Sequence, residues 1–279
     1  MRLGLSSIVT SIIGLAIIGL LVLVVVFAPF IAPYDPTKGA LGDRLTPPAW
    51  QEGGSSAHLL GTDLLGRDTL SRLIYGARTS LAVAVLAILV SGIVGSLLGA
   101  IAGYLGGWIN TIIMRAVDLA FSFPAILLAM VLAVVVGPSF LNIIFVISLV
   151  LWAEYARMAR GETLRVREMD YVALAQVAGV SRGRILVRHI LPNVASPLIV
   201  LATLQVGIVI IMESSLSFLG VGVPPPTPAW GSMIAEGRSY VVTAWWLSMV
   251  PGVAIVATVL SFNLLGDTLT ELINPSLQA

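Results

Sequence analysis

Five long stretches of this chain contain no charged residue, and this pattern restricts the possible fold more than any other feature. They run from Leu3 to Pro33, from Thr79 to Met114, from Leu119 to Ala153, from Ile190 to Met212 and from Ser239 to Gly266. A helix that crosses a lipid bilayer needs about 20 consecutive, mostly apolar residues, and every stretch meets that requirement. Charged residues make up 10% of the chain, against about 25% in soluble domains. We therefore expect an integral membrane protein.

Two of the uncharged stretches are long enough for a pair of helices. Glycine, proline and polar residues, which favour turns, interrupt one of them at 103–110 and the other at 137–139. The predicted fold class is therefore all-α and integral to the membrane, with six transmembrane helices. The expected spans are about Ile8–Phe27, Leu81–Tyr104, Thr111–Val136, Phe140–Tyr155, Val194–Met212 and Trp245–Leu265.

The distribution of arginines orients these spans. The segment 157–192 is the densest basic loop, with arginines at positions 157, 160, 165, 167, 182, 184 and 188. Positively charged loops stay on the cytoplasmic side, so with six spans both termini are expected to be cytoplasmic. A signal peptide is the alternative for the first span. Its apolar core is longer than the usual ~7–15 residues and no small-x-small cleavage pattern follows, which favours an uncleaved anchor.

Glycines recur at a spacing of four in the second expected span, at Gly95, Gly99, Gly103 and Gly107. This spacing places them along one ridge of a helix, and small residues let helix backbones approach closely in a bilayer. We expect helix packing along this ridge, either as a contact that can slide or as ordinary bundle packing.

Several charged residues fall within or near the expected spans. Arg115 and Asp118 are three apart and can pair on one helical face. Glu154 and Glu213 stand at expected span ends, which favours interfacial or capping roles. Pro251 is expected to kink the last helix, because proline removes a backbone donor.

Motifs of enzymes are absent from the sequence. It holds no cysteine, no HExxH, no GxSxG and no P-loop, and its two histidines, His58 and His189, lack partners at ligand spacing. No catalytic residue, metal site or cofactor is therefore expected in this chain, and another chain would have to bind any ATP. His58 is expected to be solvated. A net charge of +1 does not indicate nucleic-acid binding.

The segment 170–192 has an unusual pattern for a cytoplasmic loop. A short helix is expected from Asp170, with Val172, Ala175 and Ala178 on one flat stripe. Gly179 suits a left-handed position after that helix, and Ser181 can cap a second one. A solvated loop would explain the arginines but not the alanine-rich helix.

This segment resembles the cytoplasmic signature of ABC importer permeases, which reads Glu-Ala-Ala, three residues, Gly, nine residues, then Ile-x-Leu-Pro. The matching positions are Ala173, Leu174, Ala175, Gly179, His189, Leu191 and Pro192. Ala173, Leu174 and His189 replace the glutamate, the first alanine and the isoleucine of that signature. Further stretches, at 58–81, 188–193, 217–234 and 263–277, are similar to the C-type permease of dipeptide and oligopeptide importers.

The resemblance implies an N-terminal helix followed by the five-helix core of a type I importer permease. Residues 1–80 would form the first helix and an external polar loop, and residues 81–279 the core, with its coupling loop at 157–192. The subunit would lie in the bacterial cytoplasmic (inner) membrane as a multi-pass protein.

The resemblance also implies partners. A B-type permease would complete a heterodimer around one pathway, and one or two ABC ATPase subunits would hold ATP and magnesium. An extracytoplasmic substrate-binding protein would deliver a peptide. The helix around Ala173 to Gly179 would be the coupling helix that contacts an ATPase.

The proline-rich external segment is expected to face the binding protein or an external gate, or to form a structural cap. Its candidate residues are Pro224, Pro225, Pro226 and Trp230, with Glu236 and Arg238 as candidate docking charges. Nickel complexes or another small solute are the alternative cargo. A self-contained channel or carrier, and a membrane enzyme of lipid-linked substrates, are the alternative classes of protein.

Overall fold

The computed structural model describes the backbone of residues 5–273 and the side chains of residues 12–271. Within these residues every regular element is a helix, and strand-type pairing is limited to two isolated bridges in the segment 39–68. The long helices are α1 (Leu5–Ile31), α2 (Thr69–Leu105), α3 (Gly107–Phe121), α4 (Ala125–Val136), α5 (Phe140–Arg167), α8 (Leu191–Phe218) and α10 (Trp246–Ile273). The short ones are η1 (Leu41–Asp43), α6 (Asp170–Val177), α7 (Arg182–Ile185), η2 (Leu186–Ile190), α9 (Trp230–Gly237) and η3 (Arg238–Tyr240).

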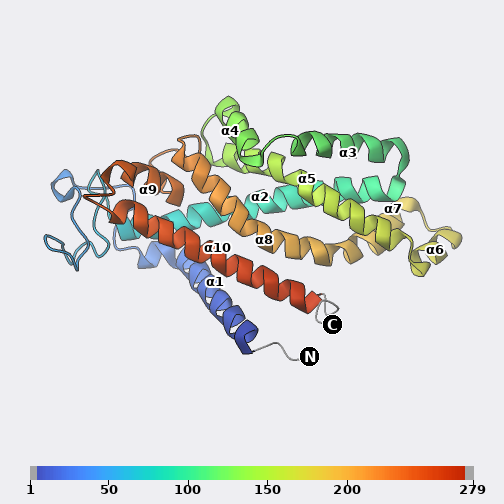
Figure 1. Ribbon diagram of the computed structural model, residues 1–279, viewed down its shortest axis with the longest axis horizontal. Helices are drawn as coiled ribbons and strands as arrows, with labels where there is room; N and C mark the ends of the chain where they lie inside the picture. Colours follow the sequence, from blue (N-terminus) through green and yellow to red (C-terminus); the bar gives the residue numbers. More distant parts are fainter. Residues whose placement is uncertain (1–4, 274–279) are drawn as a thin grey trace.

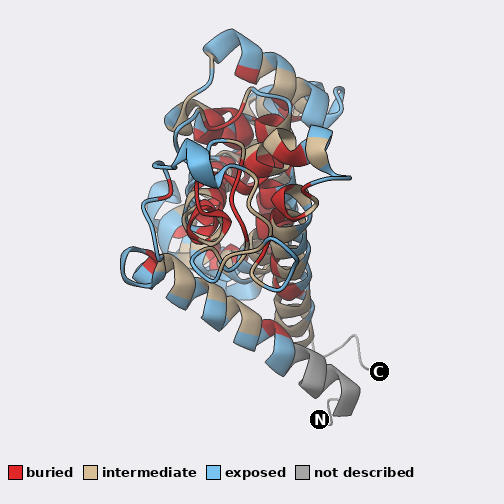
Figure 2. Cartoon of the chain, turned by 90° about the vertical axis from the view of Figure 1, so that its left-hand side faces the viewer, coloured by how far each residue is buried: buried red, intermediate tan, exposed pale blue. Residues whose placement is uncertain are grey.

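Helices α2, α5, α8 and α10 run along the length of the molecule and form a bundle (Figure 1). Helix α1 packs against α10 and α2, and α3 and α4 lie beside α5. One end of the bundle carries the segments 32–68 and 219–245, and we call it the loop end. The other carries α6 and α7, and we call it the α6 end (Figure 1). Viewed onto the loop end, buried residues gather in the middle of the bundle (Figure 2).

Five helices of the described chain are long and apolar enough to cross a membrane, and the bent pair of α3 and α4 supplies a sixth span if it counts as one. This confirms the predicted all-helical membrane fold. The breaks predicted within 103–110 and 137–139 are confirmed too. Gly106 (φ +66°) separates α2 from α3, and Gly137 (φ +86°) ends α4.

The span predicted over 111–136 is not one continuous helix. The chain bends by 92° between α3 and α4. Pro124 precedes the first residue of α4, and proline disfavours the helical conformation of the residue before it. Helix α3 therefore ends at Phe121 and α4 starts in a new direction.

Helix α2 begins well before the span predicted for it. Asp68 caps the helix by accepting a hydrogen bond of 2.8 Å from the backbone N–H of Ser71. From Thr69 the helix is continuous to Leu105. The predicted division between residues 80 and 81 therefore falls inside α2, whose first turns belong to the loop end.

Three of the four spaced glycines lie where α2 packs against α5. A Cβ added to Gly95, Gly99 or Gly103 would lie 2.3, 2.1 or 2.9 Å from a backbone oxygen of α5. Gly107 was wrongly placed on the same ridge. It opens α3 with a φ of +54°, and nothing lies within 4 Å of its Cβ position. The turn at Gly106 separates it from α2.

A buried ion-pair cluster joins three segments at the loop end. Asp63 accepts hydrogen bonds from the guanidinium groups of Arg67 (2.6 Å) and Arg72. Glu236 of α9 accepts from Arg67 at 3.0 Å and from Arg72 at 2.6 Å. Glu236, a candidate docking charge, thus binds internal arginines and keeps 28% of its side chain exposed. We call Asp63, Arg67, Arg72 and Glu236 the loop-end cluster.

His58 is not solvated as expected. Its Nδ1 lies 2.9 Å from the Asp68 carboxylate, and its side chain is 13% exposed. The same carboxylate caps α2. His58 therefore helps to attach the segment 32–68 to the start of α2.

The proline-rich segment is only partly a surface. Pro225 and Pro226 are exposed and Pro224 is half-buried. Trp230 is buried, and its Nε1 donates to the carbonyl of Leu73 at 3.0 Å. Trp230 therefore does not face a partner, and its indole anchors α9 to α2, in agreement with the alternative of a structural cap.

Charged residues within the spans have partners other than those expected. Asp118 pairs with Arg157 of α5 at 3.1 Å rather than with Arg115. Glu213 is completely buried and accepts from Ser80 at 2.9 Å and from Ser217 at 2.7 Å, so it is not an interfacial cap. Glu154 is half-buried and accepts from Gln205 of α8. The bonds of Arg157 to Asp118, Ser80 to Glu213 and Gln205 to Glu154 connect different helices, whereas that of Ser217 to Glu213 lies within α8.

Candidate functional site

Helix α6 projects from the bundle between the ends of α5 and α7 (Figure 1). Helix α5 continues to Arg167, whose guanidinium donates to the carbonyl of Gly103 in the last turns of α2 at 3.0 Å. After Glu168 and Met169 the chain enters α6 at Asp170. The ledge formed by α6 is thus rooted in a helix that is itself fixed to α2.

The end of α6 is fixed by a glycine in the left-handed conformation, as predicted. Gly179 has a φ of +75°. Its N–H donates to the carbonyl of Gln176, and the N–H of Val180 donates to the carbonyl of Ala175, at 3.0 and 3.1 Å. This pair of bonds is the Schellman arrangement, which satisfies the last carbonyls of a helix. The turn after α6 is therefore a defined structure.

The exposed face of α6 differs from the predicted flat stripe. Val172 is buried and Ala175 half-buried. Leu174 and Val177 are instead 68% and 88% exposed. Large apolar side chains this exposed on a small helix indicate a surface for a partner more than a solvated loop.

A small apolar cluster lies beneath α6 and separates it from the main core. Its buried members are Ala159, Val166, Val172, Ile185, Ile190 and Val194, from α5, α6, α7, η2 and α8. Packed side chains of this kind transmit displacement because interiors have low compressibility. We call it the ledge cluster. Sequence reasoning missed it, although apolar residues recurring between the arginines of 182–194 were a readable signal.

The chain returns from α7 to α8 through the wider turn η2. Pro192 has no N–H to donate to the carbonyl of Arg188, four residues earlier, and such a missing bond is a common cause of local irregularity. Of the signature positions here, His189 and Leu191 are half-buried and Pro192 is exposed. The His189 ring lies 6.3 Å from that of Tyr171. Ser181 precedes α7 as predicted, but its side chain makes no capping bond.

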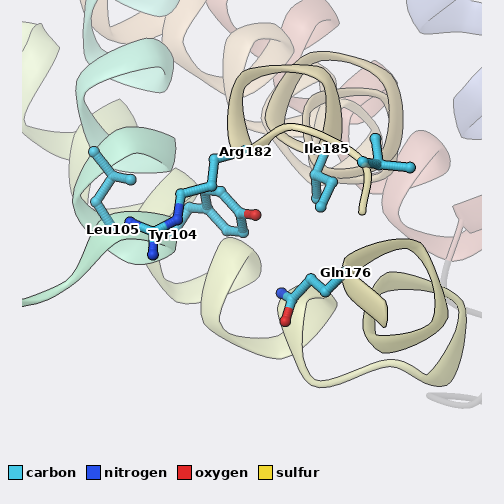
Figure 3. Close-up of a pocket in the computed structure, with 6 residues that line it drawn as sticks. Tyr104, Leu105, Gln176, Arg182 and Ile185 are labelled. Atoms are coloured by element: carbon cyan, nitrogen blue, oxygen red, sulfur yellow. The ribbon is translucent and has the colours of Figure 1, made fainter. Parts of the chain in front are cut away.

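A hollow of about 400 Å³ lies between the end of α2 and the ledge. Its lining residues come from α2, α6 and α7 and the turn between them, and are Tyr104, Leu105, Gln176, Val180, Arg182 and Ile185 (Figure 3). The close-up shows the Gln176 amide and the Arg182 side chain on opposite sides of this space (Figure 3). Polar groups and an arginine around a recess suit hydrogen bonding to a protein partner.

The signature residues do not form one compact group. Ala173, Leu174, Ala175 and Gly179 lie on α6 or in its terminal turn, whereas His189, Leu191 and Pro192 lie at the junction of η2 and α8. The ledge cluster connects the two sets, because its members come from α6 as well as from η2 and α8. This arrangement places an exposed apolar helix face over a small buried apolar cluster.

Comparison with known proteins agrees with this geometry. Residues 95–279 match the family described as the binding-protein-dependent transport system inner membrane component. Residues 10–48 match the N-terminal transmembrane domain of oligopeptide transport permease C.

Curated relatives match over almost the whole chain. The dipeptide transport system permease protein DppC of Escherichia coli (strain K12) is 46% identical over 96% of this chain and 89% of its own length. The di/tripeptide transport system permease protein DppC of Pseudomonas aeruginosa is 42% identical over 95% of this chain and 88% of its own. With a family match over more than half of its residues, this chain belongs to the inner-membrane permease components of binding-protein-dependent ABC transport systems.

Proposed function

We propose that this chain is the C-type permease subunit of an ATP-driven importer of dipeptides and oligopeptides. The names of its relatives support the peptide as cargo. In this proposal a B-type permease supplies the other half of the pathway, ATPase subunits bind ATP and magnesium, and a binding protein delivers the peptide.

The observation that carries the proposed mechanism is the exposed apolar face of α6 on a rigid base. Leu174 and Val177 dock on an ATPase, and ATP-driven closure of the ATPases displaces α6. The ledge cluster passes this displacement to α5 and α8, which open or close the pathway. The displacement shifts the permease between two states only as far as the ATPases bind those states unequally.

The arginines support the orientation of this mechanism. All seven arginines of 157–192 belong to the α6 end or its approaches, which the positive-inside rule assigns to the cytoplasm. The loop end then faces outward, toward the binding protein. Helix α1 starts and α10 finishes away from the loop end (Figure 1), so both termini are cytoplasmic in this proposal.

A charge placed on the docking face tests the coupling role. In Val177→Glu an 88% exposed apolar side chain becomes a carboxylate without a change in the ledge cluster. Val242→Glu is the matched control, because Val242 is 97% exposed at the opposite end. The measurement is the amount of ATPase that co-purifies with the permease pair, together with ATP hydrolysis stimulated by the peptide-loaded binding protein.

We expect Val177→Glu to lose most of the bound ATPase and its stimulated hydrolysis, because a buried unpaired carboxylate opposes docking. Val242→Glu should retain the ATPase at the wild-type level. Equal retention in the two variants would contradict the assignment of α6 as the docking helix. An intact complex that hydrolyses ATP without peptide uptake would instead contradict the proposal that peptides are the cargo.

A further inference from the structure

A groove runs along the α6 end of the bundle between α5, α8 and α10. Its volume is about 630 Å³. Helix α5 lines it with Met158, Glu162 and Arg165, and its polar lining from the other helices includes Asn193, Ser196 and Thr270. Glu162 and Arg165 form an ion pair of 2.8 Å at this surface, and Arg165 is 59% exposed. The groove therefore has a mixed polar and apolar lining, with an ion pair at its surface.

Glu154 continues the groove-lining face of α5 into the membrane. It precedes Met158 by four residues and Glu162 by eight, spacings that return to the same face of a helix. Fourteen residues separate it from the start of α5 at Phe140, which is about 21 Å of helix. We take the start of α5 as the outer edge of a hydrocarbon core about 30 Å thick. At this depth Glu154 then lies on the cytoplasmic side of the midplane.

Gln205 of α8 meets Glu154 at that depth. The Gln205 Nε2 donates to Glu154 Oε2, and Gln205 is 1% exposed whereas Glu154 is half-buried. The Oε1 of the same amide is buried and has no hydrogen-bond partner in the described part of the chain. The pair thus combines a half-buried carboxylate with a buried acceptor that lacks a partner, and such an acceptor is costly.

An ammonium group is the chemical complement of this arrangement. It carries three N–H donors and no acceptor, and a charged group at membrane depth is strongly disfavoured unless it meets an opposite charge or polar partners. A peptide that moves along the pathway lined in part by this subunit has an ammonium at its N-terminus. Glu154 and Gln205 offer it acceptors where the surrounding side chains are mostly apolar.

We propose that Glu154 and Gln205 form a transient binding site for the α-ammonium of the peptide on its way into the cytoplasmic groove. The inference rests on the proposed function and adds a position on its pathway. Glu154 lowers the barrier for the charged end of the peptide in the inner half of the membrane. Glu162 and Arg165 then meet the peptide at the mouth of the groove, where water is present.

The same two side chains could serve only to bind α5 to α8, since polar groups hold helices together in bilayers. Glu154→Gln separates the two roles. It keeps a side-chain oxygen that can accept from Gln205 and removes the negative charge. Asp118→Asn is the control, because Asp118 is a carboxylate on α3 that does not line the groove.

The test uses the complete transporter in proteoliposomes, with its ATPases, the binding protein and a radiolabelled dipeptide. We expect Glu154→Gln to lower the maximal uptake rate about tenfold. This factor corresponds to the free energy that one charge-assisted hydrogen bond contributes. The half-saturating peptide concentration, set by the binding protein, should stay unchanged, and stimulated ATP hydrolysis should persist. The number of peptides imported per ATP should therefore fall. Asp118→Asn should match the wild type in both measurements.

Uptake by Glu154→Gln within twofold of the wild type would overturn the ammonium site and leave the interhelical bond as the role of this pair. A second variant, Glu154→Lys, places a cation at the same position. It should abolish uptake while a folded complex still hydrolyses ATP, and uptake at the wild-type rate would likewise overturn the proposal. A wild-type complex that imports no dipeptide would instead contradict the proposed function itself.

Discussion

Gly99 of α2 lies directly against the main-chain carbonyl of Ala156 in α5. A Cβ added to Gly99 would lie 2.1 Å from that oxygen and 2.8 Å from the carbonyl carbon. Neither atom belongs to a flexible side chain, so no rotamer change can relieve the contact. The approach of the two backbones is possible only because the residue is glycine.

Replacing Gly99 by alanine should therefore push α2 and α5 apart. We expect a loss of about 1–3 kcal/mol in the free energy of unfolding, the usual cost of overpacking a well-packed interface. Thermal unfolding of the detergent-solubilised permease pair measures this as a lower midpoint temperature. Because α5 carries the ledge, stimulated ATP hydrolysis should fall as well.

Gly92→Ala is the matched control for this variant. Gly92 is also in α2 and also faces α5, but its added Cβ would lie 3.5 Å from the Tyr155 ring, an ordinary contact distance. Helix propensity then favours alanine. If Gly92→Ala lowered the midpoint as much as Gly99→Ala, close backbone packing would not explain the effect.

The loop-end cluster yields a second prediction through Asp63. This carboxylate is buried and accepts from two backbone N–H groups, those of Leu65 and Arg67, as well as from two guanidinium groups. In Asp63→Ala two buried arginines would keep only Glu236 as a counter-charge. Removing one partner of a buried ion pair costs about 3–5 kcal/mol. Amide hydrogen exchange over residues 39–68 should accelerate accordingly.

Asp35→Ala gives the comparison within the same loop. Asp35 also accepts from a backbone N–H two residues on and pairs with Lys38, but the Lys38 and Asp35 side chains are 83% and 42% exposed. Exposed pairs contribute about 0–1 kcal/mol. Exchange rates should hardly change in this variant. Equal acceleration in both variants would show that the loop opens independently of the loop-end cluster.

The membrane fold was largely predictable because the requirement behind it is local. Hydrocarbon demands an apolar run of a given length, and the turns at Gly106 and Gly137 need glycine at positive φ. Both conditions are visible in a few consecutive residues. The signal for the bend at Pro124 was local too. The prediction missed it because it rested on the hydropathy of the run 119–153 and on the turn at 137–139 alone.

The polar contacts were not predictable, because each partner comes from elsewhere in the chain. Glu213 and Ser80 are 133 residues apart, and Glu236 and Arg72 are 164 apart. The spacing rule for helices proposed Arg115 for Asp118, but the packing of α3 on α5 offers Arg157 instead. The exposed face of α6 depends in the same way on which side the ledge cluster covers. An eight-residue helix does not reveal that side by itself.

Gly179 permits a prediction that separates docking from folding. Nothing lies within 4 Å of its Cβ position, so an added Cβ meets no atom of the described chain. Its φ of +75° makes any L-residue strained, by roughly 1–2 kcal/mol. Gly179→Trp should leave the subunit inserted in the membrane and abolish stimulated ATP hydrolysis and peptide uptake, because the indole holds the ATPase away from α6.

Two smaller substitutions distinguish bulk from backbone strain at this position. Gly179→Ala introduces the strain with almost no bulk, and Gly179→Asn introduces a short side chain that tolerates the left-handed conformation. If obstruction of docking is the cause, both should keep at least about half of the uptake, because a strain of roughly 1–2 kcal/mol adds no bulk to the docked surface. Uptake as low in Gly179→Ala as in Gly179→Trp would attribute the loss to the Schellman turn and not to the docked surface. Normal uptake in Gly179→Trp would show that no partner approaches α6 at its C-terminal end.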